Sequence, residues 1–290
     1  MSHFSEISYS SSDGLSLYAR DYHAHSGPAR LPVICIHGLT RNSADFDELA
    51  PEIARMGRRV IAVDVRGRGH SDYDRNPEHY NPVVYADDVA KLAHDLGIAR
   101  AVFIGTSMGG LVTMTMAVRH PKLVAASILN DTGPRLSPKG LARIAGYAGK
   151  CEPLPSWEHA TEAIRQINEP AFPANSADEW SKWARRAFAE TEQGQLAMRY
   201  DPNIALPLAT GKLKSTSLGA RFAFRRLAKR RPTLLVRGAL SDLIEAEQAE
   251  YMRKTAPRML YAEVPGVGHA PMLTEPEAMT AVREFLAQVD

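Results

Sequence analysis

The chain has 290 residues, 44% of them hydrophobic, and a formal net charge of +2 at pH 7. The apolar fraction supplies a sizeable core, and the nearly balanced charge argues against a nucleic-acid-binding or membrane-surface protein. The first residues lack the basic start and apolar run of a signal peptide, and no apolar run approaches the roughly 20 residues of a membrane span. We therefore expect a cytoplasmic protein. Its two cysteines, Cys35 and Cys151, indicate no disulfide, and Cys35 lies in an apolar run typical of burial.

The chain begins with a predicted β-hairpin, because strand-like stretches at 7–9 and 15–22 flank Asp13-Gly14, a common turn pair. Short apolar runs and helical patterns then alternate as far as Asp131. Such alternation predicts βαβ units and a mainly parallel sheet whose strands are buried on both faces. The predicted strands are 33–36, 60–63, 101–104 and 124–129, and the predicted helices are 44–56, 83–96 and one that begins after Gly110.

The alternation stops after Asp131 and resumes at Thr233. Between these residues the chain has helical patterns separated by prolines, and no comparable strand. This predicts a helical cap at 132–231, inserted into a core made of 1–131 and 232–290. The helical patterns of the insertion are 141–148, 157–167, 180–189 and 218–227, and the core continues with strands at 233–237 and 259–264 and helices at 246–255 and 275–289.

The stretch Gly105-Thr106-Ser107-Met108-Gly109 joins a predicted strand to a predicted helix. It fits the G-x-S-x-G pattern of a nucleophile elbow. Glycines two residues to either side of Ser107 leave room for a sharp turn, and the N-terminus of the following helix favours developing negative charge. The pattern alone also fits an ordinary turn rich in glycine and serine, so residues elsewhere in the chain must decide its role.

A serine nucleophile needs a base, a group that orients the base, and donors for an oxyanion. His269 follows the last predicted strand and is the candidate base. Asp242 follows the strand at 233–237 and is the favoured acid, although such an aspartate also suits a turn or a helix cap. Asp131 ends the strand at 124–129 and competes for the same role, its alternative being to cap the turn into the insertion.

Together these motifs resemble the α/β-hydrolase fold family, in particular its serine-nucleophile, esterase-like bacterial members. The resemblance implies an eight-stranded, mainly parallel sheet flanked by helices, with a helical cap inserted after the sixth strand. It covers nearly the whole chain outside the insertion. The stretches that carry it are 36–39, 64–71, 105–110, 238–242 and 268–276.

The resemblance also implies a set of functional residues. Ser107 would be the nucleophile, His269 the base and Asp242 the acid. No metal or organic cofactor is implied. The oxyanion hole would consist of the backbone N–H groups of Leu39 and Met108, in motifs that also contain His37, Gly38, Gly105 and Gly109.

Serine at the elbow argues against haloalkane dehalogenases and epoxide hydrolases, which resemble this fold but use aspartate there. Hydrolases that cleave C–C bonds of aromatic ring-fission products keep the serine and are an alternative. They usually carry asparagine before the serine and tryptophan after the histidine, where this chain has Thr106 and Ala270. The favoured activity is hydrolysis of a carboxylic ester, lactone or thioester through an acyl-enzyme. A non-catalytic, receptor-like binding module is a further alternative, which a broken triad would indicate.

The predicted partner is a small-molecule substrate selected by the cap, and the chain could be a monomer or a dimer. A basic stretch at 212–231 contains no acid and predicts a solvated helix face, with attraction of an anionic substrate as the alternative. The loop at 66–71 is expected to be structural, with its arginines and His70 away from substrate. Aromatic residues of the insertion fit its core better than a pocket lining; they are Trp157, Trp180, Trp183 and Phe188.

Overall fold

The computed structural model describes residues 4–25, 30–150, 152–211 and 215–289. Its centre is an eight-stranded sheet in the order β1-β2-β4-β3-β5-β6-β9-β10, in which the pairs β1/β2 and β2/β4 are antiparallel and all other neighbours are parallel. The predicted sheet is therefore confirmed. The strands are β1 (Ser5–Ser10), β2 (Ser16–Tyr22), β3 (Val33–Ile36), β4 (Val60–Asp64), β5 (Ala101–Thr106), β6 (Val124–Asn130), β9 (Thr233–Gly238) and β10 (Leu260–Val264).

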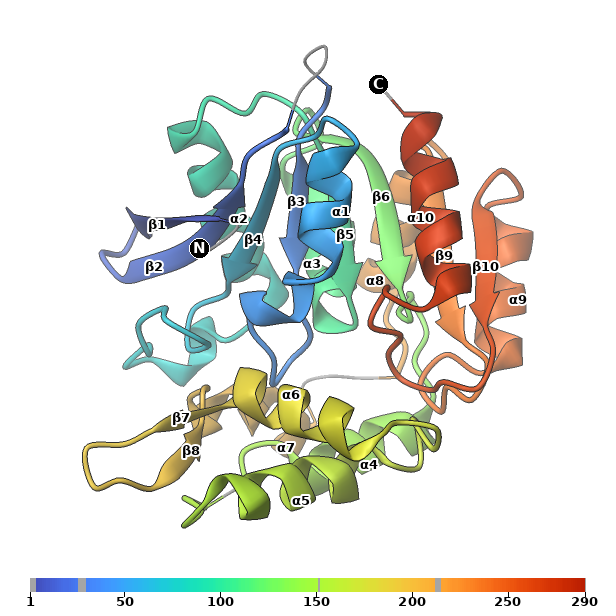
Figure 1. The fold of residues 1–290 in the computed structure, drawn as a ribbon. Coiled ribbons are helices and arrows are strands. Elements are labelled where there is room, and N and C mark those ends of the chain that lie inside the picture. The colour runs from blue at the N-terminus through green and yellow to red at the C-terminus, as the bar shows by residue number, and fades with distance from the viewer. Residues whose placement is uncertain (1–3, 26–29, 151, 212–214, 290) are drawn as a thin grey trace.

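Helices cover both faces of the sheet (Figure 1). The central strands β3, β4 and β6 are buried at every residue, as their continuous apolar sequences predict. One face packs against α1 and α10, and the opposite face packs against α2, α3, α8 and α9, so that each face has its own hydrophobic cluster. These helices are α1 (Leu49–Arg55), α2 (Pro82–Asp95), α3 (Met108–Arg119), α8 (Leu218–Ala228), α9 (Ala246–Thr255) and α10 (Pro276–Ala287).

The segment between β6 and α8 forms a separate layer past the carboxyl ends of the parallel strands (Figure 1). We call this layer, which spans residues 131–217, the insertion. Trp180, Trp183 and Phe188 belong to its own hydrophobic cluster and are nearly fully buried, in agreement with the predicted core role. The elements of the insertion are α4 (Pro138–Tyr147), α5 (Trp157–Asn168), α6 (Ala177–Ala187), β7 (Phe188–Glu190), β8 (Leu196–Met198) and α7 (Leu206–Ala209).

The insertion differs from its sequence prediction in a β-hairpin, in the short helix α7 and in the point where the core resumes. The antiparallel hairpin of β7 and β8 was not expected, because strands of three residues are too short to show an alternating pattern. Helix α8 was assigned to the insertion but packs against α3 of the core. Phe224 and Leu227 are fully buried there, and Arg226 Nε donates to the backbone oxygen of Ala117 at 3.0 Å. The core therefore resumes at α8, before the predicted boundary at 232.

The predicted helix at 44–56 consists of a 3-10 turn, Ser43–Phe46, followed by α1. Cys35 is a free, buried residue of β3, while Cys151 lies outside the described residues. Within the described ranges, no helix has both the length and the apolar character needed to cross a membrane.

Candidate active site

Ser107 lies between the end of β5 and the start of α3, at the edge of the sheet that faces the insertion. Its backbone has a φ of 52° and a ψ of −113°, an unfavourable conformation for a residue with a side chain. The surrounding structure holds it there: Ser107 N–H donates to the Asn130 carbonyl at 3.0 Å, and its own carbonyl accepts from Gly110 N–H at 3.0 Å. The predicted strand, sharp turn and helix are thus present.

The two glycines of the elbow are required by close backbone contacts. A Cβ atom on Gly105 would lie 2.4 Å from the carbonyl oxygen of Gly109. A Cβ atom on Gly109 would lie 2.0 Å from the carbonyl oxygen of Ile36. Both distances are far below van der Waals contact, and neither backbone neighbour can move aside without disturbing a strand or the helix. The sequence reasoning anticipated this steric need.

His269 joins Ser107 to a carboxylate. Its Nε2 lies 2.9 Å from Ser107 Oγ, and its Nδ1 lies 2.7 Å from Asp131 Oδ2. Asp131 is completely buried, and it also accepts hydrogen bonds from Gly238 N–H at 3.1 Å and from the Ser241 hydroxyl at 2.6 Å. The three donors orient the carboxylate and stabilise its negative charge. Serine, histidine and aspartate therefore form one hydrogen-bonded chain.

The prediction that Asp242 is the carboxylate beside His269 is wrong in geometry. Asp242 instead pairs with Arg143 of α4, whose Nε and Nη2 donate to its two carboxylate oxygens at 2.5 and 2.9 Å. Burial raises the pKa of the Asp242 carboxyl, but Arg143 outweighs burial and the net pKa is lowered. The competing residue Asp131 takes the place at the imidazole because β6 runs beside both β5 and β9, which brings its end between Ser107 and the loop after β9.

Asn130 fixes the loop that carries His269. Its Nδ2 donates to Thr106 Oγ1 at 3.0 Å and to the carbonyl oxygen of Pro271 at 2.7 Å. One side chain thus connects the residue before the serine with a residue two positions after the histidine. Sequence reasoning missed this role, and an asparagine at a strand end gives no signal that would reveal it.

The expected oxyanion donors lie beside the serine. Met108 is the first residue of α3, where a backbone N–H has no acceptor within the helix. Leu39 follows β3 in a loop that passes close to the nucleophile, since a Cβ atom on Gly38 would lie 3.7 Å from Ser107 Cβ. These positions agree with the predicted arrangement, and their role toward an oxyanion remains a prediction.

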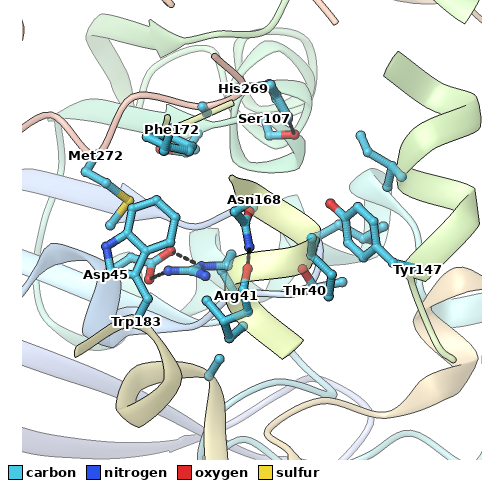
Figure 2. Close-up of a pocket in the computed structure, with 18 of the residues that line it drawn as sticks. Thr40, Arg41, Asp45, Ser107, Tyr147, Asn168, Phe172, Trp183, His269 and Met272 are labelled. Carbon is cyan, nitrogen blue, oxygen red and sulfur yellow. Dashed lines mark hydrogen bonds and ion pairs between the residues drawn. The ribbon is translucent and has the colours of Figure 1, made fainter. Parts of the chain in front are cut away.

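A cavity opens over Ser107 and His269 (Figure 2). It holds about 930 Å³ of empty space, including its mouth, and combines residues of the core with residues of α4, α5 and α6. The insertion therefore forms much of its wall. Lining residues labelled in Figure 2 are Thr40, Arg41, Asp45, Tyr147, Asn168, Phe172, Trp183 and Met272.

Polar groups in this cavity come from both layers. Arg41 and Asp45 form a bidentate ion pair at 2.8 and 2.6 Å, and the Arg41 guanidinium lies 5.4 Å from the centre of the Trp183 ring. Asn168 donates through Nδ2 to the carbonyl oxygen of Ile164 at 2.8 Å. The paired charges of Arg41 and Asp45 leave a polar but nearly neutral surface opposite the nucleophile. Of these residues the sequence analysis named Trp183 alone, as core rather than pocket lining; it belongs to the cluster of the insertion and also lines the cavity.

A family model described as the alpha/beta hydrolase fold matches residues 32–276. The chain belongs to the α/β-hydrolase fold family. It is 31% identical over 275 residues to the 3-hydroxybutyrate-oligomer hydrolase of Cupriavidus necator, a match that covers 93% of each chain. It is 28% identical over 266 residues to the 2-(acetamidomethylene)succinate hydrolase of Mesorhizobium japonicum, which covers 90% of this chain and 88% of that relative.

A solved structure of an α/β hydrolase from Novosphingobium aromaticivorans is also similar. It matches this α/β hydrolase over 100% of both chains, with a TM-score of 0.92 and 38% sequence identity. The fold and the hydrolase family are therefore shown independently of the site geometry.

His37 supports the loop that carries Leu39 in this α/β hydrolase. It is fully buried, its Nδ1 lies 2.7 Å from the Gly38 carbonyl oxygen, and its Nε2 accepts from Val65 N–H at 3.1 Å. This pattern needs a neutral imidazole with its proton on Nδ1. Burial lowers the pKa of His37 from 6.5 to about 4.

We expect His37 to make the stability of the fold depend on pH. In the unfolded chain His37 binds a proton near pH 6.5, whereas the folded protein resists protonation down to about pH 4. The stabilisation is complete above pH 6.5 and is lost as the pH falls toward 4. Urea unfolding at several pH values should show this loss, and His37→Gln should flatten the profile in that window. An unchanged slope in the variant would contradict this assignment.

Arg68 contacts both residues of the expected oxyanion hole. It is fully buried; its Nε donates to the Leu39 carbonyl oxygen at 3.0 Å, and its Nη2 lies 3.4 Å from Met108 Sδ. Its Nη1 donates to the Arg66 carbonyl oxygen at 2.8 Å and to the Tyr85 hydroxyl at 2.9 Å. Arg68 does not line the cavity, in keeping with the structural role predicted for its loop.

Replacing Arg68 with methionine is expected to lower kcat for ester hydrolysis by about 10- to 100-fold with little change in KM, because a displaced donor weakens transition-state stabilisation more than substrate binding. Steady-state kinetics below the unfolding temperature would measure this. Arg66→Lys is the matched control. Arg66 is equally buried but pairs with Asp13, Asp74 and Asp88. The Arg66→Lys change should lower Tm while kcat stays within about threefold of wild type. Equal losses of kcat in both variants would contradict a role for Arg68 at the oxyanion hole.

Among the described residues, one group of three side chains could hold a metal ion: Asp13, Asp74 and His79. Arg66 already occupies this place, since its Nη1 lies 2.8 Å from Asp13 and 2.6 Å from Asp74. A cation there would have to displace a buried guanidinium, so the donor set does not suit a metal.

The described part of the basic stretch at 212–231 does not reach the cavity over Ser107. Arg221 donates to the Tyr251 hydroxyl at 3.1 Å, and Arg231 donates to the Val124 carbonyl oxygen at 2.7 Å. These arginines attach α8 and the following turn to the core. Lys212 and Lys214 lie outside the described residues. The alternative of attracting an anionic substrate thus gains no support from the described arginines.

Proposed function

We propose that this α/β hydrolase cleaves carboxylic esters of small molecules, with Ser107 as nucleophile, His269 as general base and Asp131 as the acid that orients the base. The observation that carries the proposal is the hydrogen-bonded chain from Asp131 through His269 to Ser107 Oγ, at 2.7 and 2.9 Å. This chain borders a cavity large enough for a small organic molecule.

In the proposed reaction, Ser107 Oγ attacks the ester carbonyl carbon while His269 Nε2 takes the hydroxyl proton. The resulting oxyanion faces the N–H groups of Leu39 and Met108. The bond from carbon to the alcohol oxygen then breaks, and His269 gives its proton to that oxygen. A water molecule next gives a proton to His269 and attacks the acyl carbon. The acid leaves, and the proton returns to Ser107.

An ester substrate is supported by the relative from Cupriavidus necator, which is named for hydrolysis of 3-hydroxybutyrate oligomers. Hydroxy acids oligomerise through ester bonds, so the same bond type fits the proposed chemistry. Lactones and thioesters react through the same acyl-enzyme and belong to the proposed range. We also propose that the insertion acts as the cap that selects among them, because α4, α5 and α6 supply cavity walls.

The experiment that tests the proposal combines turnover with labelling. The purified protein is assayed on p-nitrophenyl esters, lactones and ring-fission dienones, and a parallel sample is incubated with a fluorophosphonate probe. We expect ester turnover, and peptide mapping should place the label on Ser107. Dienone cleavage without ester turnover would identify a C–C hydrolase instead. Absence of both label and turnover would favour a binding module.

A further inference from the structure

A second cavity borders Ser107, and His269 is not among the residues that line it. It comprises about 610 Å³ of empty space, including its mouth, and lies between α3, α4, α7 and the loop that leads into α2. Leu39, Ser107 and Ile144 line both this cavity and the first, so the two meet at the nucleophile. His269 lines only the first cavity, whereas Met108 lines only the second. The nucleophile therefore has two compartments of different composition on its two sides.

The second cavity is lined almost wholly by apolar side chains. Its two tyrosines have hydroxyls that are already engaged. The Tyr80 hydroxyl donates to Asp201 at 2.5 Å and accepts from Asp74 N–H at 2.8 Å. The Tyr85 hydroxyl accepts from Arg68 Nη1 at 2.9 Å. Among the described lining residues, the Thr132 hydroxyl alone is buried without a partner. A hydrocarbon group would gain burial here without leaving the tyrosine hydroxyls unpaired.

Proton transfer decides which part of an ester enters which compartment. The alcohol oxygen must lie beside His269 Nε2, because it leaves with the proton that the imidazole carries. The alcohol therefore occupies the first cavity, where His269, Arg41 and Asn168 lie. The acyl chain occupies another corner of the tetrahedral carbon and points away from the imidazole. On that side lie Met108 and the second cavity.

We propose that the second cavity is the acyl-binding site of this enzyme and that it accepts an apolar acyl chain, while the first cavity takes the alcohol. The inference rests on the proposed ester hydrolysis. It also assigns the route of the hydrolytic water, which must approach the acyl-enzyme beside His269 and hence through the first cavity once the alcohol has left.

Two bulky substitutions on the insertion test this division. Leu208 of α7 lines only the second cavity, and Ile167 of α5 lines only the first. Both side chains are partly exposed and belong to helices of the insertion, so that Leu208→Trp and Ile167→Trp introduce the same bulky group at sites of similar exposure. Leu141 of α4 also lines only the second cavity, so Leu141→Trp replaces Leu208→Trp if that variant does not fold.

Each variant is assayed on two substrate series. One series varies the acyl chain of p-nitrophenyl esters from acetate to decanoate, and the other varies the alcohol of acetate esters from phenyl to 1-naphthyl. We expect Leu208→Trp to lower kcat/KM for octanoate by about 30-fold relative to acetate, with the naphthyl-to-phenyl ratio within about threefold of wild type. Ile167→Trp should lower the naphthyl-to-phenyl ratio and spare the dependence on acyl length.

The opposite pattern, or sensitivity to acyl length in Ile167→Trp alone, would overturn the assignment. A second measurement is a crystal structure of Ser107 trapped by a p-nitrophenyl octylphosphonate, whose alkyl chain should lie against Tyr85 and Leu111; a chain directed toward Trp183 would overturn it as well. If the wild-type protein neither hydrolyses any ester nor takes up the phosphonate, the proposed function itself fails. Ester turnover with the wrong selectivity pattern shows that only the division of the cavities is wrong.

Discussion

Replacing Ser107 with alanine is expected to reduce kcat/KM for ester hydrolysis by a factor on the order of 10⁴ or more, with the fold intact. The hydroxyl lies 2.9 Å from His269 Nε2, and its removal takes away the atom that would form the acyl-enzyme. Alanine fits the elbow, because it adds no atom and the close contacts of the turn involve Gly105 and Gly109. Steady-state kinetics on a p-nitrophenyl ester, with circular dichroism to confirm folding, would measure the effect.

The matched control for this variant is Ser127→Ala. Ser127 is a fully buried serine of β6, whereas Ser107 is partly exposed, and the Ser127 hydroxyl is 3.1 Å from Thr233 Oγ1. Its loss should lower stability slightly and leave kcat/KM within about threefold. The fluorophosphonate probe should label the control variant and fail to label Ser107→Ala. Near-wild-type turnover by folded Ser107→Ala would refute the nucleophile.

Replacing Asp131 with asparagine is expected to reduce kcat by a factor on the order of 10³–10⁴. The carboxylate lies 2.7 Å from His269 Nδ1, where it fixes the tautomer and stabilises the imidazolium that forms when Ser107 loses its proton. An asparagine has nearly the same shape but carries no charge. Its amide group can also present a donor to Nδ1 and so favour the wrong tautomer. The pH–rate profile and kcat of the folded variant would measure the loss.

Asp242→Asn is the control that distinguishes the two aspartates. This change weakens the ion pair with Arg143 and leaves the hydrogen bond from His269 to Asp131 untouched. We expect kcat to fall by at most about tenfold, through a looser attachment of α4, and Tm to fall by a few degrees. A large kcat loss in Asp242→Asn together with a small one in Asp131→Asn would place the acid at Asp242 and reject the geometry described for the histidine.

The sequence carried enough information for the sheet, the elbow and the histidine because each depends on local patterns. The strands are continuous apolar runs, and the elbow needs glycines at fixed spacing around Ser107. The choice of acid depends on contacts between distant segments. Asp131 and Asp242 both lie near the same edge of the sheet. They differ in their partners: Asp242 pairs with Arg143, which lies 99 residues before it in the sequence, whereas Asp131 pairs with His269. No local pattern reveals that partner.

The boundary of the insertion was missed for a similar reason. Helix α8 has the same amphipathic character as a cap helix, and only its packing of Phe224 and Leu227 into the core shows where it belongs. The two cavities around Ser107 were also beyond sequence reasoning, since they are lined by segments from across the chain.

Through the ion pair of Arg143 and Asp242, the loop after β9 also anchors α4. This loop also holds Ser241, whose hydroxyl donates to Asp131, while α4 carries Ile144 and Tyr147 into the cavity wall. One short segment therefore anchors α4, which lines the cavity, and carries Ser241, which donates a hydrogen bond to the acid. The carboxylate of Asp242 does not contact the imidazole. Substitutions at Arg143 and Asp242 can therefore change how α4 is held while proton transfer through His269 stays intact.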